Sequence, residues 1–210
     1  MSSNRDLLSD GKIDIKKMLT YHRDNGNKHD TLSKIIMHAS SLGGTYKRIL
    51  KVFKMLDHDD SGALDTSELD QLIDLLKIPV KPEELKSIQK ESDVDGDSNI
   101  SFKEFFVTLI LVYLVSEQRS ENSESNSNIQ HLADSIISAY LIFDPECFGY
   151  IKKTQVAQLS TRDDGSDIFL NEDRWKEMDW DENQSIDFSE FVYTFATWMT
   201  DFHDDDLEDN

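Results

Sequence analysis

The sequence is organised around the stretch Asp57-His58-Asp59-Asp60-Ser61-Gly62-Ala63-Leu64-Asp65-Thr66-Ser67-Glu68. Side-chain oxygens occupy positions 1, 3, 5, 9 and 12 of this loop, at Asp57, Asp59, Ser61, Asp65 and Glu68. Gly62 stands at position 6, where the chain must turn sharply, and Ala63 at position 7 offers its backbone carbonyl. Ca²⁺ is a hard cation that takes several oxygens at about 2.3–2.6 Å, and this spacing supplies them. The stretch therefore predicts a calcium-binding loop between two helices, because an acidic surface turn rarely matches all of these positions at once.

Two further copies of the loop keep the ligands. The copy from Asp93 to Glu104 offers the backbone carbonyl of Asn99 at position 7. Its side-chain oxygens are those of Asp93, Asp95, Asp97, Ser101 and Glu104. The copy from Asp179 to Glu190 has its ligands at Asp179, Asp181, Asn183, Ser185, Asp187 and Glu190. In these copies Ser98 and Gln184 stand where glycine is expected, and a left-handed backbone costs a non-glycine residue about 1–2 kcal/mol. We expect both loops to bind Ca²⁺, with an affinity that this strain reduces.

One more copy, from Asp144 to Gln155, is degenerate. Phe148 at position 5 has no side-chain oxygen, Lys152 brings a positive charge to position 9, and Gln155 replaces the closing glutamate by a neutral amide. The glycine at position 6 and the apolar residue at position 8 survive, and these are what the fold needs. We therefore predict that this loop binds no Ca²⁺ and serves as the structural partner of the copy at residues 179–190.

Helical periodicity surrounds the loops. Apolar residues recur every three or four positions in 46–53, 69–76, 129–143 and 188–199, which is the spacing of amphipathic helices. Pro82, followed by two glutamates, marks the start of another helix. The sequence predicts an all-α fold of two lobes, each a pair of loops with their helices, at residues 45–116 and 129–200. Residues 117–128 have the Ser, Asn and Glu composition of a flexible linker, and residues 201–210 form an acidic tail.

Residues 1–44 precede the first lobe as an N-terminal extension. Within it, Asp10-Gly11-Lys12-Ile13-Asp14 imitates the middle of a calcium loop, but Leu8 and Lys17 stand at positions 3 and 12. These five residues therefore predict a capped turn before a short helix and not a metal site. Residues 31–39 carry apolar side chains at helical spacing and predict a short amphipathic helix.

The run from Phe105 to Val115 is apolar on every side of a helix. It is too short to span a membrane, which needs about 20 apolar residues. One face of it fills the core of the first lobe, and the surplus face must pack on the extension or meet a partner protein. Packing on the core and the extension is favoured, because soluble monomers rarely expose large apolar patches. Trp198 and Met199, near the end of the last apolar stripe, are candidate groove residues.

Composition excludes several classes of function. The chain has 210 residues and a net charge of −20, which would repel nucleic acids and favours bound cations or a basic partner. Its single cysteine, Cys147, indicates a reducing compartment, and we expect a cytoplasmic location. Ser2 follows Met1 and no apolar leader is evident, so neither N-myristoylation nor secretion is expected. No nucleophile–base pair or phosphate loop indicates an enzyme, and the six histidines show no metal-binding spacing.

These loops and helices resemble the four-EF-hand, calmodulin-like proteins over roughly residues 46–200. The segments 105–114, Met178-Asp179-Trp180-Asp181 and 191–198 are most similar to a plant-type branch of that family. The resemblance implies a helical protein in which a short two-stranded ladder joins the loops of each pair, with Leu64 opposite Ile100 and Ile151 opposite Ile186. The sequence departs from calmodulin in its extension, its longer linker and its third loop.

For function, the resemblance implies a calcium sensor. About three Ca²⁺ ions would bind per chain, with Mg²⁺ as a competitor, and each closing glutamate would move its helix and open an apolar groove. A basic amphipathic helix of a target protein would then occupy that groove. Two alternatives remain, namely a calcium buffer that does not open and a subunit bound permanently to an enzyme or motor.

Overall fold

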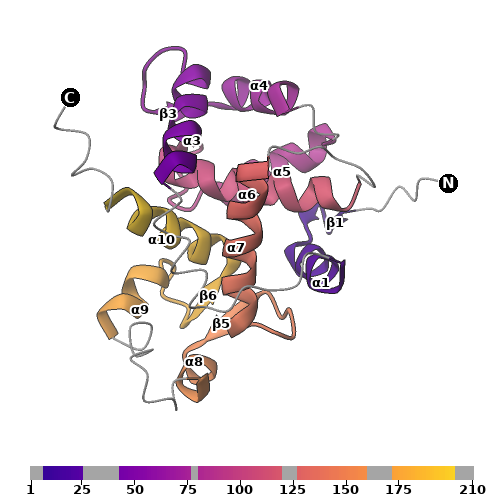
Figure 1. The fold of residues 1–210 in the computed structure, drawn as a ribbon, viewed down its shortest axis with the longest axis vertical. Helices are drawn as coiled ribbons and strands as arrows, with labels where there is room; N and C mark the ends of the chain where they lie inside the picture. The colour runs from indigo at the N-terminus through magenta and orange to yellow at the C-terminus, as the bar shows by residue number, and fades with distance from the viewer. Residues whose placement is uncertain (1–6, 26–42, 77–79, 120–126, 160–171, 202–210) are drawn as a thin grey trace.

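The computed structural model describes residues 7–25, 43–76, 80–119, 127–159 and 172–201, and these are mostly helical (Figure 1), which confirms the all-α prediction. The helices are α1 (Ile15–Asn25), α3 (Gly43–Leu56), α4 (Thr66–Leu76), α5 (Pro82–Ser92), α6 (Phe102–Glu117), α7 (Ser127–Phe143), α8 (Lys153–Leu159), α9 (Glu172–Met178) and α10 (Phe188–Asp201). The strands are β1 (Leu8–Ser9), β2 (Lys12–Ile13), β3 (Ala63–Leu64), β4 (Ile100–Ser101), β5 (Tyr150–Lys152) and β6 (Ser185–Asp187). Within the described ranges, every helix is too short or too polar to cross a lipid bilayer.

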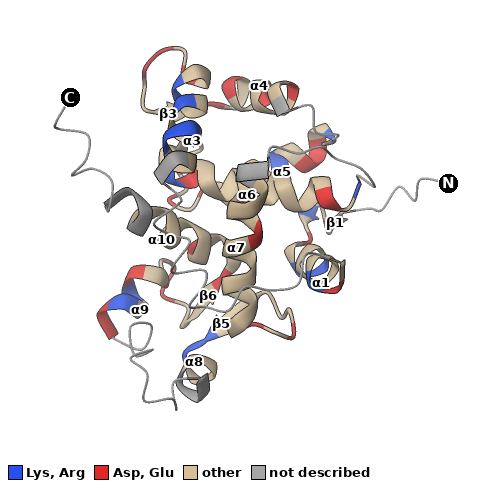
Figure 2. Cartoon of the chain, in the orientation of Figure 1, with Lys and Arg blue, Asp and Glu red and all other residues tan. Residues whose placement is uncertain are grey.

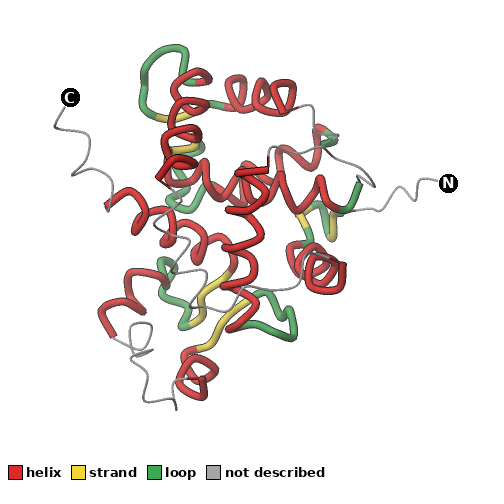
Figure 3. Tube along the Cα trace, in the orientation of Figure 1, coloured by secondary structure: helices red, strands yellow, loops and turns green. Residues whose placement is uncertain are grey.

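Short antiparallel ladders, yellow in Figure 3, join the loops in pairs. Leu64 on β3 pairs with Ile100 on β4, and Ile151 on β5 pairs with Ile186 on β6. All four side chains are buried. These are the pairs that the family resemblance implied, so that prediction is confirmed. Each ladder ties two loops together through their backbones.

The extension forms a hairpin followed by a helix, as the turn at residues 10–14 predicted. Asp10 and Gly11 connect β1 to β2 with φ angles of 52° and 75°. Asp14 Oδ1 accepts a hydrogen bond from the N–H of Lys17 at 2.9 Å and so caps α1. The hairpin is attached to α5, because the N–H of Ile13 donates to Ser87 Oγ at 2.6 Å. The helix predicted at residues 31–39 lies outside the described residues.

Helix α6 lies at the centre of the molecule (Figure 1). Every residue from Glu104 to Ser116 is buried, and α6 packs against α1, α3, α5, α7 and α10. Helix α1 contributes the fully buried Met18 and Leu19 to the common core. Packing of the apolar surplus on the extension is therefore confirmed, and α7 and α10 complete the cover.

The two EF-hand pairs form one packed body. Helix α6 belongs to the first pair and α10 to the second, and the two helices pack against each other. Tyr113 on α6 also donates to Asp134 Oδ1 on α7 at 2.6 Å. The sequence did not predict this contact between the pairs, which arises because a helix that is apolar all round cannot be covered by one pair alone. Residues 120–126 of the linker lie outside the described residues.

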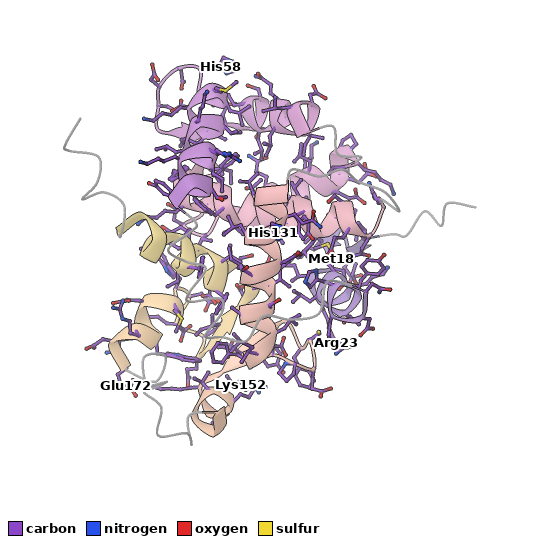
Figure 4. The ribbon with its side chains drawn as sticks, viewed as in Figure 1. Met18, Arg23, His58, His131, Lys152 and Glu172 are labelled. Carbon is purple, nitrogen blue, oxygen red and sulfur yellow. The ribbon has the colours of Figure 1, made fainter. Side chains whose placement is uncertain are left out.

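Helix α1 also reaches the degenerate loop after α7. Arg23 Nη1 donates to the carbonyl oxygen of Pro145 at 3.1 Å, and Lys16 Nζ lies 5.7 Å from the centre of the Phe148 ring. Figure 4 shows Arg23 close to this loop. Lys16 and Arg23 are about two helical turns apart and share a face of α1. The extension thus contacts both EF-hand pairs.

We expect Leu19→Ala to lower the free energy of unfolding by about 2–5 kcal/mol, because it removes a fully buried side chain and leaves a cavity. Urea denaturation of the whole chain measures this change. Lys17→Ala, at an exposed position of the same helix, is the control and should change stability by less than about 0.5 kcal/mol. If both variants are equally stable, the extension is not part of the cooperative fold.

Candidate calcium centres

The four loops, called loop 1 (57–68), loop 2 (93–104), loop 3 (144–155) and loop 4 (179–190), hold their first aspartate in the same way. The N–H at position 6 donates to Oδ2 of the aspartate at position 1. The pairs are Gly62 to Asp57 at 3.0 Å, Ser98 to Asp93 at 3.1 Å, Gly149 to Asp144 at 2.8 Å and Gln184 to Asp179 at 3.0 Å. At all four position-6 residues φ is positive, between 68° and 85°. The sharp turn predicted for position 6 is therefore present in every loop.

Position 4 of each loop is left-handed as well, which the sequence reasoning missed. The φ angles there are 54° at Asp60, 75° at Gly96, 54° at Cys147 and 55° at Glu182. Loops 1 and 2 therefore each have one glycine at the two left-handed positions, whereas loop 4 has none. The backbone strain that the sequence assigned equally to loops 2 and 4 is greater in loop 4. Gly96 was the signal that could have shown this.

The closing glutamate is bound across the loop in loops 1, 2 and 4. One of its oxygens accepts from the N–H at position 2: Glu68 from His58 at 2.8 Å, Glu104 from Val94 at 2.9 Å and Glu190 from Trp180 at 2.9 Å. The other oxygen accepts from the N–H at position 9, which is Asp65 at 3.1 Å, Ser101 at 2.8 Å and Asp187 at 2.8 Å. Backbone amides thus hold both oxygens that Ca²⁺ would take, at the first turn of the exiting helix.

The side chain at position 9 caps that exiting helix. Asp65 Oδ1 accepts from the N–H of Glu68 at 2.9 Å, and Asp187 Oδ1 accepts from the N–H of Glu190 at 2.8 Å. Ser101 Oγ plays the same part in loop 2 at 3.4 Å. These bonds complete reciprocal capping boxes with the bonds of the closing glutamates. Position 9 therefore fits a ligand that contacts Ca²⁺ through water, as it often does in such loops.

Carboxylates at positions 1, 3 and 12 converge in three clusters. One oxygen of every member lies within 4.8 Å of the others in Asp57, Asp59 and Glu68, in Asp93, Asp95 and Glu104, and in Asp179, Asp181 and Glu190. Oδ1 of Asp93 and Oδ1 of Asp179 are buried, and among the described residues they have no hydrogen-bond partner. A buried, unpartnered carboxylate oxygen beside other carboxylates is costly without a cation. The donor set therefore fits Ca²⁺.

The predicted ligands at positions 5 and 7 bond to each other. In chain order these bonds join Ser61 Oγ to the Ala63 carbonyl at 2.8 Å, the Asn99 N–H to Asp97 Oδ1 at 2.7 Å and the Ser185 N–H to Asn183 Oδ1 at 2.8 Å. These residues lie on the more exposed side of each loop. The position-5 residues also bond to the carboxylate clusters: Ser61 Oγ to Asp57 Oδ1 at 3.4 Å, the Asp97 N–H to Asp95 Oδ1 at 3.2 Å and Asn183 Nδ2 to Asp181 Oδ2 at 2.6 Å.

Loop 3 is held without a closing carboxylate. Gln155 Oε1 accepts from the N–H of Lys152 at 2.7 Å. Loop 3 therefore keeps the bond between positions 12 and 9 that the closing glutamates make in the other loops. Position 2 is Pro145, which has no N–H to hold position 12. Lys152 Nζ lies 5.2 Å from the centre of the Tyr150 ring. That loop 3 binds no Ca²⁺ stays a prediction, and Pro145 at position 2 adds a fourth departure to those at positions 5, 9 and 12.

Burial perturbs the carboxylates of loop 4. It raises the pKa of Glu190 to about 7, with a hydrogen bond from the Asp187 N–H opposing the rise and the charge of Asp187 adding to it. Burial also raises the pKa of Asp187. In loop 1, by contrast, hydrogen bonds lower the pKa of the exposed Asp59 and Asp65. Without a cation, loop 4 therefore takes up a proton near neutral pH.

Loops 2 and 4 open on one cavity of about 500 Å³. Asp93 lines it from loop 2, and Asp181 and Glu190 line it from loop 4. Glu91 also lines it, and its pKa is raised by burial and by the charge of Asp187. Because the carboxylates of the two loops repel each other across this space, a cation in one loop would favour the ionised carboxylates of the other.

Comparison with known proteins places this geometry in a family. A model of the EF-hand domain pair matches residues 46–106, which contain loops 1 and 2. The chain is 31% identical over 187 residues to "Probable calcium-binding protein CML22" of Arabidopsis thaliana, covering 84% of this chain and 82% of that protein. The chain belongs to the calmodulin-like EF-hand proteins.

Other calmodulin-like relatives extend the likeness over most of the chain. "Probable calcium-binding protein CML21" of Arabidopsis thaliana is 23% identical over 202 residues, or 93% of this chain and 87% of that protein. "Calmodulin-like protein 6" of Homo sapiens is 33% identical over 143 residues, or 67% of this chain and 71% of that protein. The resemblance drawn from the sequence, including its plant-type placement, is therefore confirmed.

We expect Gln184→Gly to tighten Ca²⁺ binding at loop 4 of this calmodulin-like chain by about fivefold. Glycine removes the strain of the positive φ at this position. The gain in binding free energy is on the order of 1 kcal/mol after the entropy cost of glycine is subtracted. Ser98→Gly should do the same for loop 2, and Gly62→Ser, the reverse change, should weaken loop 1 by a similar factor. Calorimetric Ca²⁺ titration measures all three. Unchanged affinities throughout would show that the loops reach this turn without strain.

We expect the Ca²⁺ affinity of loop 4 to fall as the pH drops below about 7. The raised pKa of Glu190 means that Ca²⁺ must displace a proton there, which weakens binding by up to about tenfold per pH unit. The folding stability of the metal-free protein depends on pH in the opposite direction. The stabilisation that comes from protonating Glu190 is fully present below the pKa of glutamate in the unfolded chain, about 4.3. It is lost as the pH rises through the pKa in the folded chain, about 7.

Tryptophan fluorescence measures this affinity selectively, since Trp175, Trp180 and Trp198 all lie in the second EF-hand pair. A titration series between about pH 5.5 and pH 8 covers the range. Loop 1, followed by calorimetry in the same series, is the internal control, because hydrogen bonds lower the pKa of Asp59 and Asp65 there. An affinity that stays constant across the series in the wild-type protein would contradict the assignment of this proton to Glu190.

Proposed function

We propose that this calmodulin-like protein is a non-enzymatic, cytoplasmic calcium sensor that binds about three Ca²⁺ ions, through loops 1, 2 and 4, and regulates a target protein. The observation that carries the proposal is the double attachment of Glu68, Glu104 and Glu190 to backbone amides. Ca²⁺ takes both oxygens of the glutamate at position 12. Binding would therefore draw each glutamate, and the first turn of its helix, toward the aspartates at positions 1 and 3.

Two of the three helices that would move, α6 and α10, join the two EF-hand pairs. Glu104 lies in the first turn of α6 and Glu190 in the first turn of α10, and these two helices pack against each other. A displacement at either glutamate therefore acts on both EF-hand pairs. Sensor EF-hands answer such a displacement by changing the angle between their helices and exposing an apolar groove. Here the surface exposed would come from α6 and from the helices that cover it.

Charge favours a basic target. The chain carries a net charge of −20, and the charges are sorted between helices. Figure 2 shows acidic residues on α4, whereas lysine and arginine gather on α3. A basic amphipathic helix would be steered toward the acidic side and away from α3. Mg²⁺ in excess would compete for the oxygen ligands of the loops, although it demands a stricter octahedral shell than Ca²⁺ does.

A calcium buffer is the second candidate, and the complete cover of α6 favours it. Because residues 104–116 are all buried, opening must separate α6 from α1, α7 or α10. Buffer EF-hands bind Ca²⁺ and barely open. The two candidates therefore differ in one measurable property, which is whether Ca²⁺ binding exposes apolar surface.

We expect Ca²⁺ to increase the fluorescence of an apolar dye several-fold and to allow a synthetic basic amphipathic peptide to bind. The double variant Glu104→Gln with Glu190→Gln should lose both responses, because neither exiting helix is pulled. Gln155→Ala, the matched change at position 12 of loop 3, should keep them. Calorimetric Ca²⁺ binding with no dye response would identify a buffer. Binding of the peptide in chelator as well would identify a permanently bound subunit.

A further inference from the structure

A cluster of potential metal ligands lies outside the EF-hand loops, where α1, α6 and α7 meet. His22 comes from α1, Glu117 from the end of α6 and Asp134 from α7, and one ligand atom of each lies within 4.8 Å of the others. In the described part of the chain, this is the one such cluster that includes a nitrogen donor. Sequence spacing could not connect these residues, because 95 positions separate His22 from Glu117.

The three side chains are already held in place. His22 Nδ1 lies 2.7 Å from Glu117 Oε2, and Tyr113 OH donates to Asp134 Oδ1 at 2.6 Å. The rings of His22 and Tyr113 meet edge to face, with their centres 6.5 Å apart. An outer hydrogen bond like that of Tyr113 fixes the orientation of a carboxylate ligand. The ligand atoms therefore need little rearrangement to meet at one point.

Burial and charge also suit a cation. His22 is 4% exposed, whereas the side chain of Glu117 is 17% exposed, so the cluster is sheltered and can still be reached from solvent beside Glu117. Two carboxylates stand against one imidazole, which leaves the junction net negative even when the imidazole is protonated. A divalent cation would neutralise the two carboxylates.

We propose that His22, Glu117 and Asp134 form a binding site for a borderline divalent metal, Zn²⁺, separate from the calcium centres. Zn²⁺ binds imidazole and carboxylate ligands, and three protein ligands with one water molecule complete its usual shell. Ca²⁺ and Mg²⁺ prefer shells of oxygen alone, so the imidazole discriminates against them. The site takes one ligand from the extension and one from each EF-hand pair. Bound Zn²⁺ would therefore fasten the three parts together at α6.

The test is a Zn²⁺ titration of the whole chain in excess Mg²⁺, followed by calorimetry and native mass spectrometry. Mg²⁺ competes for the all-oxygen loops and leaves a nitrogen-containing site free. The expected result is one Zn²⁺ ion per chain that excess Mg²⁺ does not displace. Co²⁺, used in place of Zn²⁺, should give the visible absorption of a four-coordinate site.

Variants separate this site from other histidines and from the loops. Glu117→Gln and Asp134→Asn keep the side-chain shape and should each weaken Zn²⁺ binding by at least about 100-fold, and His22→Gln should abolish the Co²⁺ absorption. Tyr113→Phe should weaken binding by about 10–100-fold, as loss of an outer partner does. The controls are His131→Gln, at an exposed position of α7 (Figure 4), and His58→Gln, at position 2 of loop 1.

The proposal is overturned if the wild-type chain holds no Zn²⁺ in excess Mg²⁺. It is also overturned if His131→Gln or His58→Gln removes the bound ion, since Zn²⁺ then sits at an exposed histidine. Retention of full affinity in both Glu117→Gln and Asp134→Asn would likewise exclude the site. Circular dichroism of each variant confirms that it is folded before its affinity is compared.

Discussion

The burial of α6 is the constraint on which the rest of the structure depends. This helix of 16 residues has apolar side chains on every side. Burying one Val, Leu, Ile or Phe fully contributes about 1.5–3 kcal/mol, while a whole domain is stable by only about 5–15 kcal/mol. Exposing one face of α6 would therefore remove a large part of the stability. The extension and the helices α7 and α10 are arranged as they are because α6 must be covered.

The metal-free calcium loops are held by their own backbones. Each closing glutamate accepts two N–H bonds, so Ca²⁺ competes with a satisfied hydrogen-bond arrangement and not with an empty site. The loops also differ in strain, with glycine at one left-handed position in loops 1 and 2 and at neither in loop 4. These differences would grade the loops by affinity, with loop 1 filled before loop 4.

Local features of the fold could be predicted from the sequence because their causes are local. The spacing of oxygens around Gly62 follows from positions within one loop, whereas the ladder pairs such as Leu64 with Ile100 were implied by the family resemblance. The cover of α6 could be predicted only in part. Its excess of apolar residues required a partner surface, and the extension was the nearest segment, but nothing in the pattern indicated α10.

The features that escaped prediction depend on tertiary contacts or on backbone conformation. Position 4 is left-handed in every loop, but only Gly96 marks it in the sequence. The junction of His22, Glu117 and Asp134 joins three helices, and no spacing within one segment could indicate it. The hydrogen bond from Arg23 to the carbonyl of Pro145 also joins distant segments and could not be predicted from local spacing.

The attachment of α1 also fixes the order in which the chain can fold during its synthesis. The partners of α1 come late, since Glu117 follows His22 by 95 residues and Pro145 follows Arg23 by 122. At about 5–20 residues per second, the ribosome needs on the order of 5–20 s to add the first of these intervals. A helix of 11 residues is marginal alone, so this segment stays unfolded meanwhile, with Met18 and Leu19 open to chaperones. Helix α1 is thus made well before the residues that it packs against.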